Sequence, residues 1–454
     1  MKVVKFGGSS LASGEQFKKV LQIILSDTAR KIVVVSAPGK RSQSDKKVTD
    51  LLIENAEYFL KYREINEGLL EQVVNRYSSI AEEVGIRTDI VSEIKADIKT
   101  KLQKDFKNEE RYIDEVKASG EDNNARLLAA YFKEQGKEAC YINPFEAGLF
   151  VTDQPGNAQV LPESYENLSS LKERSGILVF PGFFGYSKDG QILTFSRSGS
   201  DITGSILANA IKAELYENFT DVDAVYSANP FVVKNPKEIR ELTYREMREL
   251  SYAGFSVLHD EALIPAFRAG IPVNIKNTNN PSAPGTKIVN TRTNTNGPVI
   301  GIASAKGFCS IYVSKYLMNR ELGFGRKLLH ILEDYNLSYE HSPSGIDDIS
   351  IILREDGFGK EIEEAIISRI FNELEADEVK IERDLALIMV VGEGMRHNVG
   401  TTARASKALA GSGVNIEMIN QGSSEVSMMF GVKEVDEKRA VISLYEEFFV
   451  SIPV

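Results

Sequence analysis

The beginning of the chain alternates between an apolar run and a helical pattern. Residues 1–6 read Met-Lys-Val-Val-Lys-Phe, and residues 7–10 read Gly-Gly-Ser-Ser. A capping-box pair at Ser13 and Gln16 then opens a stretch with apolar residues every three or four positions. This apolar stripe consists of Phe17, Val20, Leu21 and Ile24. The pattern predicts a strand, a glycine turn and a helix.

A second apolar run and a long helical region follow. Lys31–Ala37 is almost entirely Ile and Val and ends at Pro38-Gly39, which is typical of a parallel strand buried on both faces. Residues 45–118 are charged with a helical period and predict an α-rich excursion. Ser119–Asp122 is predicted to open a further helix that ends at Gly136.

Strand-like and helical runs continue to alternate up to about residue 276. The strand-like runs are Glu138–Ile142, Gly176–Phe180, Gln191–Phe195, Glu214–Phe219 and Ile271–Lys276, and the helical ones include Ser200–Ile211, Tyr244–Ala253 and Glu261–Ala269. This alternation predicts a three-layer α/β/α domain around a mostly parallel sheet. Asn277–Pro298 is rich in Asn, Thr, Pro and Gly and is predicted to be a connector that contains a domain boundary.

The remaining chain contains an internal repeat with an offset of 77 residues, in which Gly323 matches Gly400. Each unit predicts strand, loop, helix, strand, strand and helix, which makes two α+β units of βαββαβ type once a last strand is added. Glu378–Arg383 is expected to complete the first unit, and Val299–Ala303 is expected to cross over and complete the second. The predicted domains are residues 1–295, 296–383 and 384–454.

Composition and charge narrow the possible partners. The chain has 454 residues, 42% of them hydrophobic, and a net charge of −11, which argues against binding to nucleic acid or to an anionic membrane. No apolar run approaches the ~18 residues of a membrane helix. Cys140 and Cys309 form no CxxC pair and are expected to be free thiols. Together these features predict a cytoplasmic protein.

Three polar clusters follow predicted strands. They are Lys5–Ser10, Thr194–Asp201 and Asn218–Tyr226. Ligands of open parallel sheets sit outside the carboxyl ends of the strands, so all three clusters would face one crevice. Cations, backbone donors and carboxylates are what phosphoryl transfer requires. The alternative is that these are ordinary turns, with Asp201 and Asp221 as capping residues.

Several familiar signatures are absent from the sequence. There is no GxxxxGK[ST] motif, no protein-kinase motif set, and no GxGxxG after a strand. The four histidines lack metal-ligand spacing and are expected at the surface or at caps, and no protein metal site is predicted. They are His259, His330, His341 and His397.

The motifs together resemble those of the aspartate kinases of the amino-acid kinase family. Lys5–Ser10 is similar to their opening KFGG[TS]S, Val33–Ala37 to the second-strand VVVSA, and Phe219–Tyr226 to the nucleotide-binding TDVDGVY. Leu250–Gly254 with Val257–His259 resembles the helix beyond, and the tandem units resemble paired ACT domains. The resemblance covers essentially the whole chain.

The resemblance implies transfer of a phosphoryl group from ATP, with Mg²⁺, to the β-carboxylate of L-aspartate. The catalytic residues would be Lys5 and Asp201. The substrate-binding residues would be Thr49, Glu121, Arg197 and Ser200, with Glu121 on the ammonium and Arg197 on the α-carboxylate. The phosphate and nucleotide residues would be Lys5, Gly7, Gly8, Ser9, Thr220, Asp221 and Tyr226. An amino-acid substrate independently needs one cationic and one anionic anchor, and its carboxylate is already a nucleophile.

The sequence departs from the family at the nucleotide site. Phe231 stands where the family usually has an arginine, Ser256 stands where it often has a lysine, and the segment around Arg197 lacks one glycine. Two cationic contacts to ATP are therefore missing. Three lysines are candidates to replace them, namely Lys234, Lys237 and Lys276.

Resemblance to ACT domains further implies a homodimer or dimer of dimers under feedback control. Lysine is the first candidate effector and threonine the second, at allosteric positions Met318, Gly323, Phe324, Ser338 and Glu340. Two other functions stay open: a relative acting on glutamate, N-acetylglutamate or UMP, and a non-catalytic amino-acid sensor.

Overall fold

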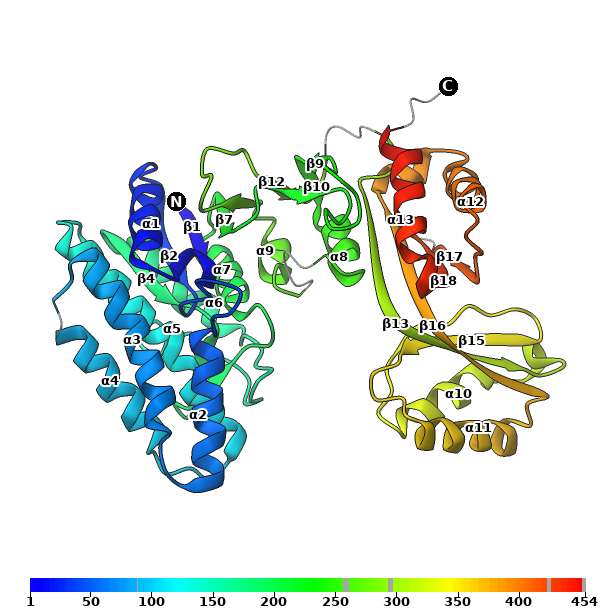
Figure 1. Ribbon diagram of the computed structural model, residues 1–454, viewed down its shortest axis with the longest axis horizontal. Helices are drawn as coiled ribbons and strands as arrows, with labels where there is room; N and C mark the ends of the chain where they lie inside the picture. Colours follow the sequence, from blue (N-terminus) through cyan, green and yellow to red (C-terminus); the bar gives the residue numbers. More distant parts are fainter. Residues whose placement is uncertain (88, 256–260, 293–296, 423–425, 451–454) are drawn as a thin grey trace. The chain divides into compact units, whose positions relative to one another are not determined.

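The computed structural model describes the 454 residues apart from 88, 256–260, 293–296, 423–425 and 451–454. The chain divides into two compact units (Figure 1). The first unit contains Met1–Val225, Glu238–Arg248 and Ser256–Thr293. The second contains Tyr226–Lys237, Glu249–Phe255 and Asn294–Val454.

The first unit is built on an eight-stranded sheet in the order β10-β12-β11-β7-β1-β2-β4-β3. Its strands are β1 (Lys2–Phe6), β2 (Arg30–Val35), β3 (Ala139–Tyr141), β4 (Ile177–Pro181), β7 (Leu215–Thr220), β10 (Glu241–Thr243), β11 (Val273–Asn277) and β12 (Thr286–Val289). Every pairing is parallel except that of β11 with β12. The prediction of a mostly parallel α/β sheet is confirmed.

Five helices gather beside this sheet and share one apolar core with it (Figure 1). They are α1 (Gly14–Leu25), α2 (Val48–Tyr62), α3 (Glu67–Val84), α4 (Asp89–Leu102) and α5 (Glu109–Glu134). Because strand side chains alternate between faces, Val4 and Phe6 enter this core whereas Lys5 points to the other face. Ser13 caps α1 as predicted, with its hydroxyl 3.4 Å from the amide of Gln16. The Gln16 side chain does not close the box, since it donates to Asn279.

The prediction that Ser119–Asp122 opens a helix is wrong, because these residues lie inside the continuous helix α5. Gly120 marks a close contact in the helix and not a boundary. A Cβ at this position would lie 3.0 Å from the Cβ of Ala37 and 3.3 Å from Leu52. The glycine lets α5 approach the end of β2, which brings Glu121 next to the strand ends.

The other face of the sheet carries α7 (Gly199–Ala210), which contacts β1, β2 and β7. The first unit also contains α6 (Glu163–Ser169) and α9 (Ile264–Ala269), while α8 (Tyr244–Tyr252) and the pair β8 (Val225–Tyr226) and β9 (Glu238–Ile239) span the division. The predicted strand Gln191–Phe195 does form, but as β6 (Ile192–Thr194) of a separate hairpin with β5 (Phe184–Tyr186). The predicted connector likewise contains a strand, β12, because Thr286 and Ile288 alternate into the core.

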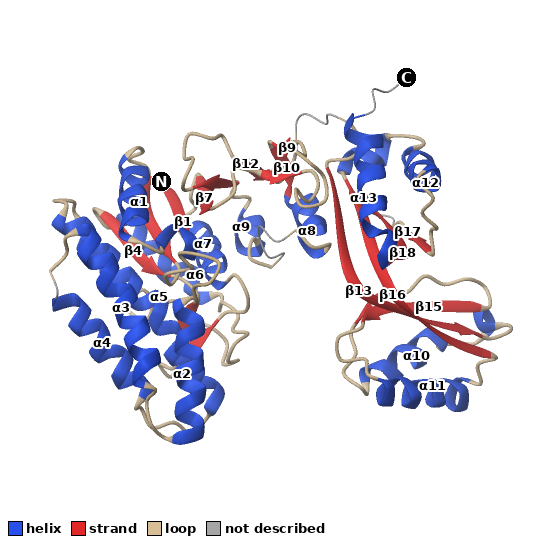
Figure 2. Ribbon diagram, in the orientation of Figure 1, coloured by secondary structure: helices blue, strands red, loops and turns tan. Residues whose placement is uncertain are grey.

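The second unit is a six-stranded antiparallel sheet in the order β14-β15-β13-β16-β18-β17 (Figure 2). Its strands are β13 (Gly301–Ser314), β14 (Tyr339–His341), β15 (Asp348–Arg354), β16 (Glu378–Val391), β17 (Met418–Asn420) and β18 (Ser427–Lys433). Its helices are α10 (Phe324–Glu333), α11 (Lys360–Leu374), α12 (Thr401–Gly411) and α13 (Glu437–Tyr445).

Two long strands, β13 and β16, run through both halves of this sheet. Ser310–Ser314 pairs with Glu378–Glu382 in one half, and Gly301–Ala305 pairs with Leu387–Val391 in the other. The crossing strand that the repeat predicts at Val299–Ala303 is therefore paired from Gly301 onward. Each half has its own apolar core, one with α10 and α11 and one with α12 and α13.

Candidate active site

The lysine of the opening strand is held at the end of the sheet by two buried neighbours. Lys5 Nζ lies 2.6 Å from Asp201 Oδ1 and 3.5 Å from Asn218 Oδ1. Asn218 in turn donates to Asp201 Oδ1 at 2.7 Å. Lys5 and Asp201 are each 7% exposed. The ammonium is thus fixed where β1, β7 and the start of α7 meet.

The turn after Lys5 interlocks with the turn after β2. The amide of Gly39 donates to the carbonyl of Gly8 at 2.8 Å, and a Cβ on Gly39 would lie 2.5 Å from the Gly8 carbonyl carbon. The Gly7 amide donates to the Phe219 carbonyl at 3.1 Å, so its N–H is not free to bind a phosphate, contrary to the prediction. The amides of Gly8 and Ser9 open a 3₁₀ turn, Gly8–Leu11, and have no acceptor among the described residues. These two amides can bind an anion.

A cavity of about 620 Å³ lies at these strand ends and collects most of the predicted site. The predicted residues that line it are Lys5, Gly7, Gly8, Ser9, Thr49, Glu121, Ser200, Asp201, Thr220 and Asp221. Arg197 and Tyr226 do not line it. These ten predicted residues all lie in the first unit and come from five separate stretches of the sequence.

Glu121 is the most unusual group in this cavity. Its side chain is buried on α5, and its Oε2 atom has no hydrogen-bond partner. Burial raises the pKa of Glu121 from its ordinary 4.5 to about 8, although the amides of Ala37 and Glu121 and the charge of Lys117 oppose the shift. A buried carboxyl oxygen without a hydrogen-bond donor is costly unless a cationic ligand supplies one.

The segment before α7 places its residues differently from one another. Ser200 is 6% exposed and lies in the cavity, whereas Arg197 is exposed and lies outside it. Ser198, next to Arg197, has a left-handed backbone with φ of 59°. This conformation favours glycine, so Ser198 stands at a position of the segment where a glycine would fit without strain.

None of the three lysines considered as replacements for the lost nucleotide cations is among the residues that line the cavity. Lys237 Nζ donates to the carbonyl of Phe449. Lys276 is partly buried within range of the charges of Glu217 and Arg30, and burial lowers its pKa. Lys234 and Phe231 are exposed in the second unit. Ser256 and the rest of the motif through His259 lie outside the described residues.

The sequence analysis did not predict that the loop after β2 lines the cavity. Eight lining residues come from this loop and the start of α2, and of these only Thr49 was predicted: Ser36, Ala37, Pro38, Gly39, Lys40, Lys47, Thr49 and Asp50. The sequence does contain a sign of this role, because the apolar strand that ends at Pro38-Gly39 resembles the opening strand that ends at the Gly7-Gly8 turn. A glycine turn at the carboxyl end of a second central strand should have been assigned to the site.

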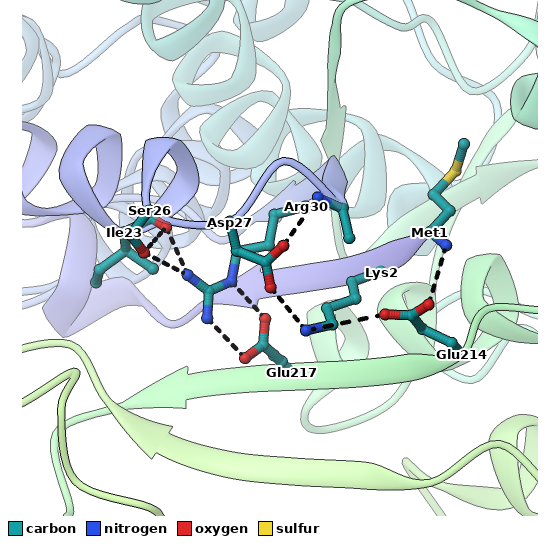
Figure 3. A network of polar contacts seen from close by, with 9 residues as sticks. Met1, Lys2, Ile23, Ser26, Asp27, Arg30, Glu214 and Glu217 are labelled. Carbon is teal, nitrogen blue, oxygen red and sulfur yellow. Dashed lines mark hydrogen bonds and ion pairs between the residues drawn. The ribbon is translucent and has the colours of Figure 1, made fainter.

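A second group of charges lies at the opposite, amino-terminal edge of the same strands (Figure 3). Arg30 binds Glu217 through two hydrogen bonds of 2.6 and 2.8 Å and also donates to Ile23 and Ser26. Lys2 Nζ lies 2.7 Å from Asp27, and the terminal amine of Met1 lies 3.6 Å from Glu214. Here every charged group drawn has a partner.

Other predicted features are distributed as follows. Both cysteines are free thiols as predicted, and burial raises the pKa of Cys309 to about 12. His330 is exposed beside Glu333, but His341 is half-buried against Asn420, because β14 and β17 approach each other there. His259 and the His397 side chain lie outside the described part.

Metal and membrane features were searched within the described residues. No set of three or more His, Cys, Asp or Glu side chains there could enclose a metal ion. None of the helices described is both long enough and apolar enough to span a bilayer.

The predicted allosteric residues lie in the second unit, around α10. Met318 and Phe324 are buried, and Glu340 pairs with Arg354 at 3.1 Å. Ser338 lines a groove of about 820 Å³ beside α10, but the other four allosteric positions do not. The groove is open to solvent on a face made by α10 and the start of β14.

Comparison with known proteins agrees with this architecture over the full length. The model of the amino acid kinase family matches residues 1–277, and a model of the ACT domain matches residues 388–448. Aspartokinase 3 of Bacillus subtilis is 68% identical over 100% of this chain and 99% of its own.

Solved structures agree as well. The crystal structure of Clostridium acetobutylicum aspartate kinase has a TM-score of 0.87 at 39% identity, covering 99% of this chain and 100% of its own. A structure of E. coli aspartokinase III with lysine and aspartate, in the T-state, has a TM-score of 0.74 at 25% identity, covering 99% of both chains.

Proposed function

This chain belongs to the amino acid kinase family, and within it to the aspartate kinases, and from this premise we propose its reaction. It transfers the γ-phosphoryl group of ATP to the β-carboxylate of L-aspartate and forms 4-phospho-L-aspartate. A carboxylate oxygen forms the new bond to phosphorus. The bond between phosphorus and the bridging oxygen breaks, and its electron pair leaves on the β-phosphate of ADP.

The observation that carries this proposal is that one cavity contains both a phosphate cradle and a buried carboxyl with one unpartnered oxygen. Lys5, Gly8 and Ser9 supply a fixed cation and two free amides for the phosphoryl group. Glu121 supplies the anion that an amino-acid ammonium requires. An N-acylated amino acid or a nucleotide has no such ammonium and would leave Glu121 unsatisfied.

Lys5 and Asp201 divide the catalytic work. Charge builds up on the phosphoryl oxygens as transfer proceeds, and an immobilised ammonium stabilises that charge without reorganising. Asp201 holds the ammonium 2.6 Å away and keeps it from turning aside. No general base is needed, because the acceptor is already ionised.

The rest of the substrate site follows from position. Thr49 and Ser200 face the cavity and would orient aspartate. Arg197, which is exposed beside the cavity segment, would bind the α-carboxylate in bidentate fashion once it turns inward. Thr220 and Asp221 would contact the nucleotide, with Tyr226 beyond them.

Mg²⁺ fits this site as an ion that enters with ATP. In kinases this ion is commonly held by the substrate phosphates and one or two carboxylates, and not by a protein cage. Asp221 is exposed on the cavity wall and could supply one carboxylate. The ion would neutralise phosphate charge.

The direct test is an ATP-dependent hydroxamate assay with L-aspartate, L-glutamate or no acceptor. We expect product with aspartate only. Absence of aspartate-dependent product at millimolar ATP would contradict the proposal and favour a non-catalytic sensor. Product with glutamate at equal efficiency would assign the chain to a different substrate.

We further propose feedback control in the cytoplasm as the first step toward lysine, threonine and methionine. The ACT domain match supports an amino-acid effector, and the E. coli aspartokinase III structure contains lysine. Lysine is therefore the first candidate and threonine the second, acting on a homodimer or dimer of dimers. Adding each amino acid to the same assay, with sedimentation analysis, tests both points.

A further inference from the structure

The loop between β2 and α2 is held against the cavity by one buried arginine. Arg76 of α3 is 3% exposed. Its Nη1 donates to the Gly39 carbonyl at 2.5 Å, and its Nη2 donates to Asp45 Oδ2 at 2.6 Å and to the Lys46 carbonyl at 3.3 Å. All three acceptors belong to this loop, so Arg76 fixes it near both of its ends.

The loop is also attached directly to the phosphate cradle. Gly39 donates to the Gly8 carbonyl at 2.8 Å, and Val48 donates to the Pro38 carbonyl at 3.2 Å. The hydrogen bonds from Arg41 and the charge of Arg76 lower the pKa of Asp45 to about 2, so its carboxylate stays ionised. Because Gly39 contacts Gly8 and Ser9, the backbone of the next residue, Lys40, lies close to the free amides of Gly8 and Ser9.

Two lysines of this loop line the cavity without a counterion. Lys40 and Lys47 are exposed, and neither forms an ion pair with any described residue. The other cations nearby are engaged, because Arg41 pairs with Asp45, Lys46 pairs with Glu54 at 2.6 Å, and Lys5 pairs with Asp201. Lys40 and Lys47 are thus the lining lysines without a carboxylate partner among the described residues, and their charge is available to an anionic ligand in addition to that of Lys5.

We propose that Lys40 and Lys47 bind the oxygens of the phosphoryl group in transfer, and that Arg76 with Asp45 positions them. This inference rests on the proposed function and says which residues replace the cations lost from the nucleotide motif. Both lysines keep their protons throughout. They stabilise the charge of the group while its bond to ADP breaks and its bond to the aspartate carboxylate forms.

Lys40→Met and Lys47→Met test the proposal against a matched control from the same loop. Each is expected to lower kcat/KM for ATP about tenfold to a hundredfold, because a charge-assisted contact is lost. The Kd of ADP should stay within about twofold, since ADP lacks the transferred group. Lys46→Met, which breaks only the pair with Glu54, should change neither value.

Three results would overturn the assignment. They are an unchanged kcat/KM for ATP in both variants, an equal loss of affinity for ADP, or an equal loss in Lys46→Met. A wild-type chain without aspartate-dependent ADP formation would instead refute the proposed function. The two failures are therefore distinguishable in the same set of assays.

The positioning role needs a variant that keeps Arg76 in its buried site. Asp45→Asn removes the ion pair but leaves the bonds from Arg76 to Gly39 and Lys46. We expect kcat/KM for ATP to fall about threefold to tenfold in the wild-type background. In a Lys40→Met/Lys47→Met background Asp45→Asn should add nothing, whereas a merely structural role would cause the same loss in both.

Discussion

The two edges of the parallel sheet carry similar charged residues, but these residues are paired to different extents. At the amino-terminal edge, Lys2, Arg30 and their carboxylates are fully paired (Figure 3). At the carboxyl-terminal edge, Glu121 has an unpartnered oxygen and Lys40 lacks a counterion among the described residues. Residue type alone does not separate a structural charge from a functional one. At the carboxyl-terminal edge even Lys5 is paired with Asp201, so the functional edge is marked by the unpartnered Glu121 oxygen and the uncompensated lysines of the same cavity.

The largest expected effect comes from breaking the paired edge. Arg30→Met leaves Glu217, whose side chain is 3% exposed, as a buried charge without a partner. The free energy of unfolding should fall by about 3–5 kcal/mol. Urea unfolding followed by circular dichroism measures it. Arg30→Met/Glu217→Leu should recover most of the loss, and failure to do so would mean that the pair is not the cause.

The second effect contrasts two lysines of the same strand. Lys5→Met should lower kcat by about 10²–10³-fold, because the lost ammonium stabilises charge that develops during transfer. Lys2→Met removes an ammonium that is paired with Asp27 at the other edge, and it should leave kcat within about twofold. Steady-state kinetics at saturating ATP and aspartate compares them. Equal losses in the two variants would contradict the assignment of the edges.

The third effect is a pH dependence that belongs to the unpaired edge. Because the pKa of Glu121 is about 8, the free enzyme carries this group mostly protonated at neutral pH. An ammonium prefers the ionised form, so kcat/KM for aspartate should rise about tenfold per pH unit up to about pH 8. Glu121→Gln should abolish this rise of kcat/KM with pH and should raise the KM for aspartate. A rise of kcat/KM with pH that persists in Glu121→Gln would show that another group titrates.

The same shift makes Glu121 a growing cost to stability between about pH 4.5 and about pH 8. The folded state holds the proton more tightly than the unfolded state, so this group costs nothing below about pH 4.5. Its contribution then becomes increasingly unfavourable as the pH rises toward 8. Glu121→Gln should flatten the fall in stability over this range, as measured by urea midpoints.

The smallest effect concerns backbone strain at the functional edge. Ser198 has a left-handed φ of 59°, so Ser198→Gly should raise the free energy of unfolding by about 1 kcal/mol. Ser196 has no positive φ, and Ser196→Gly should give no gain, since glycine only loosens the unfolded chain there. Urea unfolding of the two variants decides, and equal shifts would rule out strain at Ser198.

The position of the functional edge was predictable from the sequence, because the strands are apolar runs that end at glycine turns, whereas the paired charges at the other edge were not predicted. Lys5, Asp201 and Glu121 were placed by motif and by strand position. Gly120 was misread as a helix start, since a glycine that permits close packing looks the same in sequence as one that ends a helix. The role of Arg76 could not be predicted, because its acceptors are backbone carbonyls and a carboxylate about thirty residues away.

The surroundings of the unpaired groups could not be predicted from the sequence either. Nothing in the residues around Glu121 shows that one oxygen lacks a donor or that burial raises its pKa. Lys276 was a reasonable candidate for a nucleotide cation, yet it is partly buried within range of the charge of Glu217 and is not among the residues that line the cavity. Such outcomes depend on which face each strand presents after the sheet is assembled.

The long strand β13 has a consequence for how the chain is synthesised. Its residues Gly301–Ala305 pair with Leu387–Val391, which leave the ribosome more than eighty residues later. Until then this segment is an unsatisfied strand edge, the kind that pairs with other chains. The repeat units therefore cannot mature one after the other, and a chain that stops after residue 383 leaves the segment exposed. The sequence-distant contact ties completion of the sheet to completion of translation.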